Sequence, residues 1–176
     1  MTPLTATVGT CTTSPTWAGM GQRQPTPRSR REPRRLLTEP KLVPLELSKT
    51  VIIIEVKGPE PAWFYPTLSW LQRLNHLGEN WDSYGGRPPQ DDVIVNALEL
   101  IGHLLGHDST PPAIVPTSAG GVQLEWHRAG DELEIRVAPN GEISAFRVNE
   151  AAGEVDELDR VTLSDLGPLV ALTGQL

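Results

Sequence analysis

The chain has 176 residues, of which 38% are hydrophobic, and this suits one small domain accompanied by a segment outside the core. Its single cysteine, Cys11, excludes internal disulfides and cysteine-rich zinc sites. The apolar runs are too short to span a bilayer, and the first residues lack the apolar stretch of a secretory signal. We therefore expect a cytoplasmic protein that does not associate with membranes.

Charge is distributed unevenly along the chain. Residues 1–50 contain eight Lys and Arg against three Asp and Glu, whereas residues 51–176 carry a net charge of −12. An acidic body repels the phosphate backbone, so nucleic acid could bind only through the basic segment. The arginines that would contact it are Arg28, Arg30, Arg31, Arg34 and Arg35.

The proline-rich start of the chain predicts a boundary between a tail and a domain. Residues 1–45 contain seven prolines and no periodic apolar pattern, so they bury too little surface to offset the entropy of ordering. We expect a disordered basic tail over 1–45 and a single small α+β domain over 46–176.

Three helices and one strand are predicted around a sheet. The β-branched run over 50–57 favours an extra strand. Apolar residues at helical spacing predict helices over 66–77 and 91–105, and a last short helix over 163–172. The apolar stripe of the first helix is expected to include Trp70, Leu71, Leu74 and Leu77.

From Ala113 onward the apolar period changes from 3.6 to 2, which predicts an antiparallel β-meander of about four strands, 113–117, 121–128, 131–138 and 142–149. The helices should cover one face of this sheet. A two-residue turn at Ala129-Gly130 pairs Trp126 with Leu133. A second two-residue turn at Asn140-Gly141 pairs Ile135 with Phe146. Residues 150–159 are expected to form an acidic connector.

The same register predicts a polar outer sheet face. It places Glu125 opposite Glu134 and His127 opposite Glu132, with Arg147 on the far side of Glu134 to offset the repulsion. Two interpretations follow. Glu125, Glu134 and His127, together with Asp82, could serve as catalytic acid–base groups or bind a divalent metal. Alternatively, this is the ordinary solvated face of an antiparallel sheet.

Residues 80–89, NWDSYGGRPP, carry turn-forming residues and two aromatic residues. An aspartate that forms a local turn and glycines that permit positive φ suit a tight loop. The aromatic residues could pin the loop against the domain, or the loop could bind a partner. Together with the sheet face, the candidate binding residues are Trp81, Asp82, Tyr84, Arg87, Gln123 and Glu125.

The loop, the helix after it and the segment Gly120 to His127, GGVQLEWH, occur in an order that resembles a family of small bacterial and phage-associated proteins. These proteins share an N-W-D-x-Y-G loop, a helix and a G-G-x-Q-L-E-W strand. The resemblance covers about residues 68–148. It implies an α+β fold and a prokaryotic cytoplasmic setting, and it implies no particular activity.

Three hypotheses for function remain at this point. The leading one is a non-enzymatic protein-interaction module, an accessory, antitoxin-like or immunity-like protein whose acidic surface binds a protein partner. It fits a sequence without a phosphate-binding loop, a nucleophile elbow or a zinc-protease motif, and no cofactor is expected. The alternatives are a metal-dependent hydrolase or nuclease that uses the polar sheet face, and a nucleic-acid binder that uses the arginine-rich tail.

Overall fold

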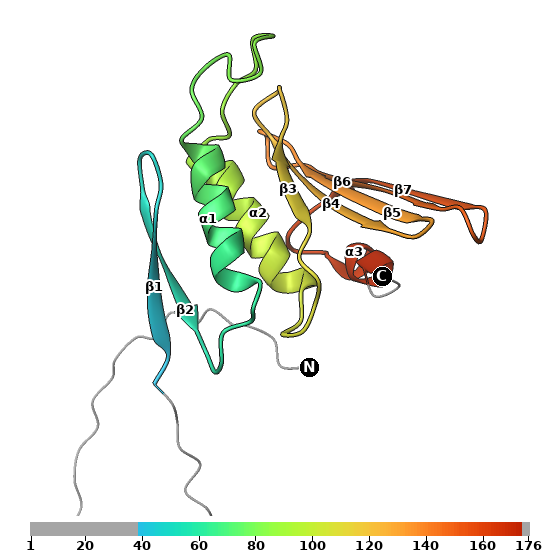
Figure 1. Ribbon diagram of the computed structural model, residues 1–176, viewed down its shortest axis with the longest axis horizontal. Helices are drawn as coiled ribbons and strands as arrows, with labels where there is room; N and C mark the ends of the chain where they lie inside the picture. Colours follow the sequence, from blue (N-terminus) through green and yellow to red (C-terminus); the bar gives the residue numbers. More distant parts are fainter. Residues whose placement is uncertain (1–38, 174–176) are drawn as a thin grey trace, which may run out of the picture.

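The computed structural model describes residues 39–173 and confirms the α+β class (Figure 1). Within this range the chain forms three helices, a two-stranded antiparallel sheet and a five-stranded antiparallel sheet. Residues 1–38 lie outside the described range, and with them most of the predicted tail, including its five candidate arginines. None of the described helices is long and apolar enough to cross a membrane.

The two-stranded sheet is a hairpin of β1 (Lys41–Glu46) and β2 (Val51–Val56). The second strand confirms the one predicted over 50–57. The first is a correction, because it extends the folded domain into residues 41–45, which the sequence predicts as tail. Its alternation is nevertheless regular: Val43 and Leu45 are buried, and the residues between them are exposed. Pro44 in the middle of this short strand hides the pattern, since proline weakens a strand prediction.

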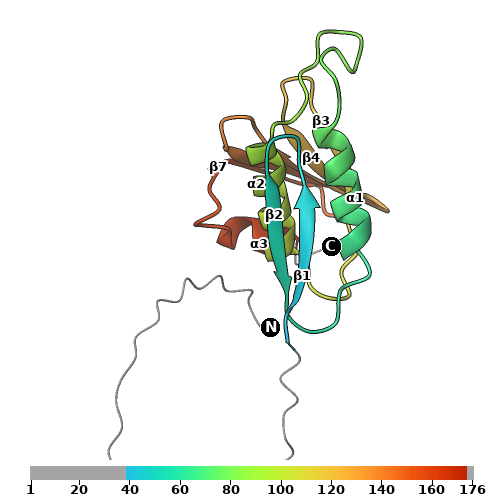
Figure 2. The ribbon, with the colours of Figure 1, turned by 90° about the vertical axis from the view of Figure 1, so that its left-hand side faces the viewer.

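Helices α1 (Phe64–Asn75) and α2 (Asp91–Leu104) form a layer between the hairpin and the larger sheet (Figure 1). Figure 2 shows the hairpin lying in front of both helices. Leu71 and Leu74 are buried as predicted. Trp70, however, is 52% exposed, and the guanidinium of Arg73 lies over its ring, 5.3 Å from the ring centre. The predicted apolar stripe is therefore wrong at Trp70. The buried side of α1 instead begins with Phe64, Thr67 and Leu68.

The larger sheet has the order β3-β4-β5-β6-β7. Its strands are β3 (Ala113–Pro116), β4 (Val122–Arg128), β5 (Asp131–Val137), β6 (Ile143–Asn149) and β7 (Glu154–Val161). The first four match the predicted meander closely. The fifth is a correction, because β7 lies in the segment predicted as an acidic connector. Four acidic residues in this strand mask its alternation, since on an exposed edge both faces can be polar.

The register between β4 and β5 is as predicted, with Trp126 opposite Leu133 and Glu125 opposite Glu134. Between β5 and β6 it differs by one residue, so that Ile135 faces Ala145 and Glu134 faces Phe146. The cause is the turn, in which the N–H of Ala138 donates to the carbonyl of Glu142 and encloses a three-residue loop. Gly141 ends this loop at φ 82°, the left-handed position that a three-residue hairpin requires.

This register shift exchanges the two faces of β6. Phe146 is 43% exposed on the outer face, whereas Arg147 is 2% exposed on the core face. The guanidinium of Arg147 donates from Nε to Asp131 Oδ1 over 2.9 Å and from a terminal nitrogen to Asp131 Oδ2 over 2.7 Å. Arg147 thereby holds the pKa of Asp131 below its ordinary value. Arg147 can therefore be buried in the core, because Asp131 on the neighbouring strand β5 compensates its charge.

Helix α3 (Gly167–Thr173) lies under the sheet beside β7 and confirms the last predicted helix, although it begins four residues later (Figure 1). Its Leu169 and Leu172 join the same core as α1, α2 and the inner sheet face. The three helices of residues 39–173 therefore lie on one side of the five-stranded sheet.

Candidate protein-binding surface

The outer face of the five-stranded sheet is open to solvent in the described part of the chain (Figure 1). One row of side chains across it combines carboxylates with an aromatic ring. In this row Glu125 faces Glu134, Glu134 faces Phe146, and Phe146 faces Glu157. Val155, 64% exposed, lies in the next row opposite Val148. The surface therefore has an apolar centre on β6 and β7 with acidic neighbours on either side.

The three candidate catalytic residues of this sheet do lie on one face, in the predicted positions. His127 Nε2 is 3.4 Å from Glu125 Oε2, and His127 Nδ1 is 3.7 Å from Glu132 Oε1. Glu125 also accepts a hydrogen bond from the amide of Gln123 over 2.9 Å. Among residues 39–173 no group of three or more His, Cys, Asp or Glu side chains is arranged to hold a metal ion.

Glu125 and Glu134 form a like-charge pair without the predicted compensation, because Arg147 points into the core. We expect Glu134→Gln to raise the free energy of unfolding by about 0.5 kcal/mol, since it removes a directly opposed repulsion. Urea unfolding of the full chain would measure this. Glu157→Gln is the matched control, because its neighbour on β6 is Phe146, and it should change stability less. A loss of stability in Glu134→Gln would show that Glu134 is held favourably after all.

Asp82, the fourth catalytic candidate, lies apart from this face and organises the 80–89 loop. Its Oδ1 accepts the N–H groups of Tyr84 and Gly86, both over 2.8 Å, and its Oδ2 accepts the hydroxyl of Ser118 over 2.6 Å. These donors, Ser118 first, lower the pKa of Asp82 from its ordinary value. The carboxylate is thus engaged in fixing the loop to the β3–β4 turn.

The remaining candidates in the loop divide into anchors and exposed groups. The indole N–H of Trp81 donates to the carbonyl of Arg87 over 3.1 Å, which closes the base of the loop. Tyr84 is 93% exposed at its tip, and Arg87 is exposed beside the base. A Cβ on Gly86 would lie 2.6 Å from Asp82 Oδ2, so the second glycine is needed for this packing. The structural and the binding interpretation of the loop are therefore compatible.

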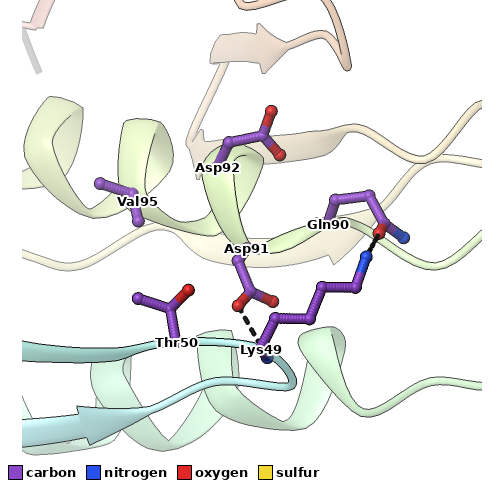
Figure 3. A pocket seen from close by; sticks show the side chains of 6 residues that line it. All are labelled: Lys49, Thr50, Gln90, Asp91, Asp92 and Val95. Atoms are coloured by element: carbon purple, nitrogen blue, oxygen red, sulfur yellow. Dashed lines mark hydrogen bonds between the residues drawn. The ribbon is translucent and has the colours of Figure 1, made fainter.

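A hollow of about 350 Å³ lies between the β1–β2 turn and the start of α2 (Figure 3). The N–H of Lys49 donates to Asp91 Oδ2 over 2.9 Å, and its ammonium donates to Gln90 over 2.9 Å. Burial alone would raise the pKa of Asp91, but hydrogen bonds from Asn75 and Lys49 hold it below its ordinary value. These contacts join the hairpin to the helices, so this hollow has a structural role.

Sequence reasoning missed the apolar part of the surface. Phe146 was placed on the core face and Val155 in a connector, so neither was a candidate. The signal was present in Pro139-Asn140-Gly141, because proline, asparagine and glycine in this order suit a three-residue hairpin loop with glycine in the left-handed position. A three-residue loop at this position places Phe146 on the outer face.

Comparison of the chain with protein-family models, with curated proteins and with solved structures returned no match.

Proposed function

We propose that this protein is a non-enzymatic interaction module that binds a basic protein partner through the outer face of its five-stranded sheet. The observation that carries the proposal is the exposed Phe146, flanked by Glu134 and Glu157 on the neighbouring strands. A large apolar side chain surrounded by polar groups is the usual arrangement of a binding hot spot. Covering the exposed part of this ring with a partner would release ordered water and favour association.

Charge supports a basic partner. The outer face carries Glu125, Glu132, Glu134 and Glu157, and residues 51–176 have a net charge of −12. Carboxylates around an apolar centre attract a positively charged surface and speed its association at low ionic strength. The resemblance to small bacterial and phage-associated proteins supports an accessory, antitoxin-like or immunity-like role in a prokaryotic cytoplasm. The acid–base residues of this face serve in recognition under this proposal.

Co-purification with the tagged full chain from the source organism tests the proposal. We expect a complex at low salt that weakens as salt is added, because screening reduces the attraction between exposed charges. Phe146→Ala should weaken the complex by about 30-fold or more, the loss typical of a hot spot. The measurement is the binding constant of the recovered partner for each purified variant.

Ile53→Ala is the matched control, because Ile53 is an apolar strand residue, 57% exposed, on the separate hairpin. It should leave the affinity unchanged. Equal melting temperatures of the two variants would exclude unfolding as the cause of lost binding. Recovery of no partner at low salt, or equal losses in both variants, would refute the proposed surface.

A further inference from the structure

A second feature, the loop over 80–88, projects beyond the ends of β3 and β4 at the top of Figure 1. Its base is tied to the domain at two points, where the N–H of Arg87 donates to the carbonyl of Ser118 and the hydroxyl of Ser118 donates to Asp82. Within the loop, the N–H of Asn80 donates to the carbonyl of Gly86, and Asn80 Oδ1 accepts the N–H of Gly85 over 2.7 Å. The loop is therefore a fixed structure on the surface.

The backbone of this loop is held in an unfavourable conformation at one residue. Ser83 has a φ value of 66°, in the left-handed region that residues with a side chain seldom adopt, whereas Asn80, at φ 61°, is a residue type that tolerates this region. Such strain persists only where surrounding contacts hold the backbone in place. Strained residues are concentrated at sites that bind ligands or partners. Here the side chains of Asn80 and Asp82 make those contacts from inside the loop.

The same contacts leave one large group at the tip. Tyr84 is 93% exposed, and its neighbours Ser83 and Gly85 are too small to shield it. A tyrosine loses little conformational entropy when it is bound, because it has only two side-chain torsions, and its hydroxyl can still form a hydrogen bond. A loop that is already rigid adds little further entropic cost. The tip therefore has the properties of a preformed anchor.

We propose that this loop inserts Tyr84 into a deep, mainly apolar pocket of the partner protein. Only a concave surface can surround a side chain that projects from a narrow tip, whereas a flat surface would contact the tip alone. The pocket should end in a polar group that meets the phenol hydroxyl, and its rim should accept the exposed guanidinium of Arg87. This inference rests on the proposed function, and it adds that the loop binds a pocket of the partner.

Site-specific photo-crosslinking in the full chain tests the inference separately from the sheet-face proposal. p-Benzoylphenylalanine, a photoreactive residue of similar shape to tyrosine, replaces Tyr84 in one variant, Phe146 in a second and Ile53 in a third as background. Each variant is irradiated in lysate of the source organism, and the attachment points are mapped on the structure of the captured protein. We expect cross-links from position 84 to residues that line a pocket.

Each of four results would overturn the insertion, the sheet-face proposal or both. Cross-links from position 146 without any from position 84, or cross-links from position 84 to a flat surface, overturn the insertion and leave the sheet-face proposal standing. Cross-links from position 84 into a pocket without any from position 146 support the insertion and overturn the sheet face. Yields at both positions no higher than at position 53 overturn both.

Affinity measurements with the captured protein then test the role of rigidity. Tyr84→Ala should weaken binding by about 30-fold or more, as expected for a buried aromatic anchor, and Tyr84→Phe should retain most of the affinity. Asp82→Ala keeps the tyrosine but removes three hydrogen bonds from the loop, so it should also weaken binding. Wild-type affinity in Tyr84→Ala would overturn the inference.

Discussion

Replacing Asp131 by alanine is expected to lower the free energy of unfolding by about 1.5–3 kcal/mol, because it removes the two charge-assisted hydrogen bonds that a buried guanidinium donates. The guanidinium side chain of Arg147 is only 3% exposed, and Asp131 supplies both oxygens of a bidentate contact. Asp156 and Glu154 also stabilise the charge of Arg147, but the stability lost with Asp131 should still exceed that lost when an exposed ion pair is broken, because the guanidinium is buried. Urea unfolding at neutral pH measures the difference.

Asp159→Ala is the matched control for this prediction, because it removes an exposed carboxylate from the edge strand β7. It should change the free energy of unfolding by less than about 0.5 kcal/mol. Similar losses in the two variants would mean that overall charge, and not the buried pair, decides stability.

The pair also predicts how acid affects stability. The pKa of Asp131 is lower in the folded state than in the unfolded chain, because Arg147 stabilises its charged form. Its contribution is therefore fully present above the unfolded pKa and is lost as the pH falls through the folded pKa. The difference in stability between wild type and Asp131→Ala should stay constant near neutrality and shrink in this acidic range. A difference that shrinks toward alkaline pH instead would contradict the assignment.

Replacing Asn75 by alanine should lower the free energy of unfolding by about 2–4 kcal/mol, because its buried amide joins three segments of the chain. Its Oδ1 accepts the N–H and the hydroxyl of Ser48 in the β1–β2 turn, over 2.6 and 2.8 Å. Its Nδ2 donates to Asp91 at the start of α2 over 2.9 Å. The substitution leaves these groups unsatisfied at the junction of hairpin and helices.

The loss should be concentrated in the hairpin. Hydrogen exchange of β1 and β2 amides in Asn75→Ala should become faster than exchange in β4 and β5, since local opening needs only the hairpin to leave the helices. Gln72→Ala is the control, because it removes one exposed hydrogen bond from the same helix to the carbonyl of Glu46. Uniform acceleration across both sheets would show that the hairpin opens only with the whole domain.

Much of the fold could be predicted because local signals agreed with the tertiary environment. The alternation in β4 and β5 and the two-residue turn at Ala129-Gly130 fix one register, and the structure confirms it. The errors arose where a local signal was ambiguous. Asn140-Gly141 suits a two-residue turn, but Pro139 before it allows a three-residue loop, and a shift of one residue exchanges the faces.

The candidate site could be predicted only in its polar part. Glu125, Glu134 and His127 share a face because the β4–β5 register places them there, and Asp82 organises its loop through the local turn that aspartate favours. The apolar centre was missed, since it depends on the β5–β6 register, which the Pro139-Asn140-Gly141 loop sets, and on β7, whose acidic residues mask its alternation. Nor does the sequence pattern show that Tyr84 is exposed while Trp81 is anchored, because both are aromatic residues in the same loop.

The two edges of the five-stranded sheet determine how the protein avoids aggregation. The edge strand β3 is only four residues long and ends in Pro116, which has no N–H to offer a neighbouring chain. The opposite edge, β7, carries Glu154, Asp156, Glu157 and Asp159, and an irregularity beside Arg160 bends its pairing with β6. Neither edge is therefore a good template for strand addition, so growth into fibres is disfavoured. A protein built in this way can expose an apolar ring on its sheet face and still remain a discrete molecule.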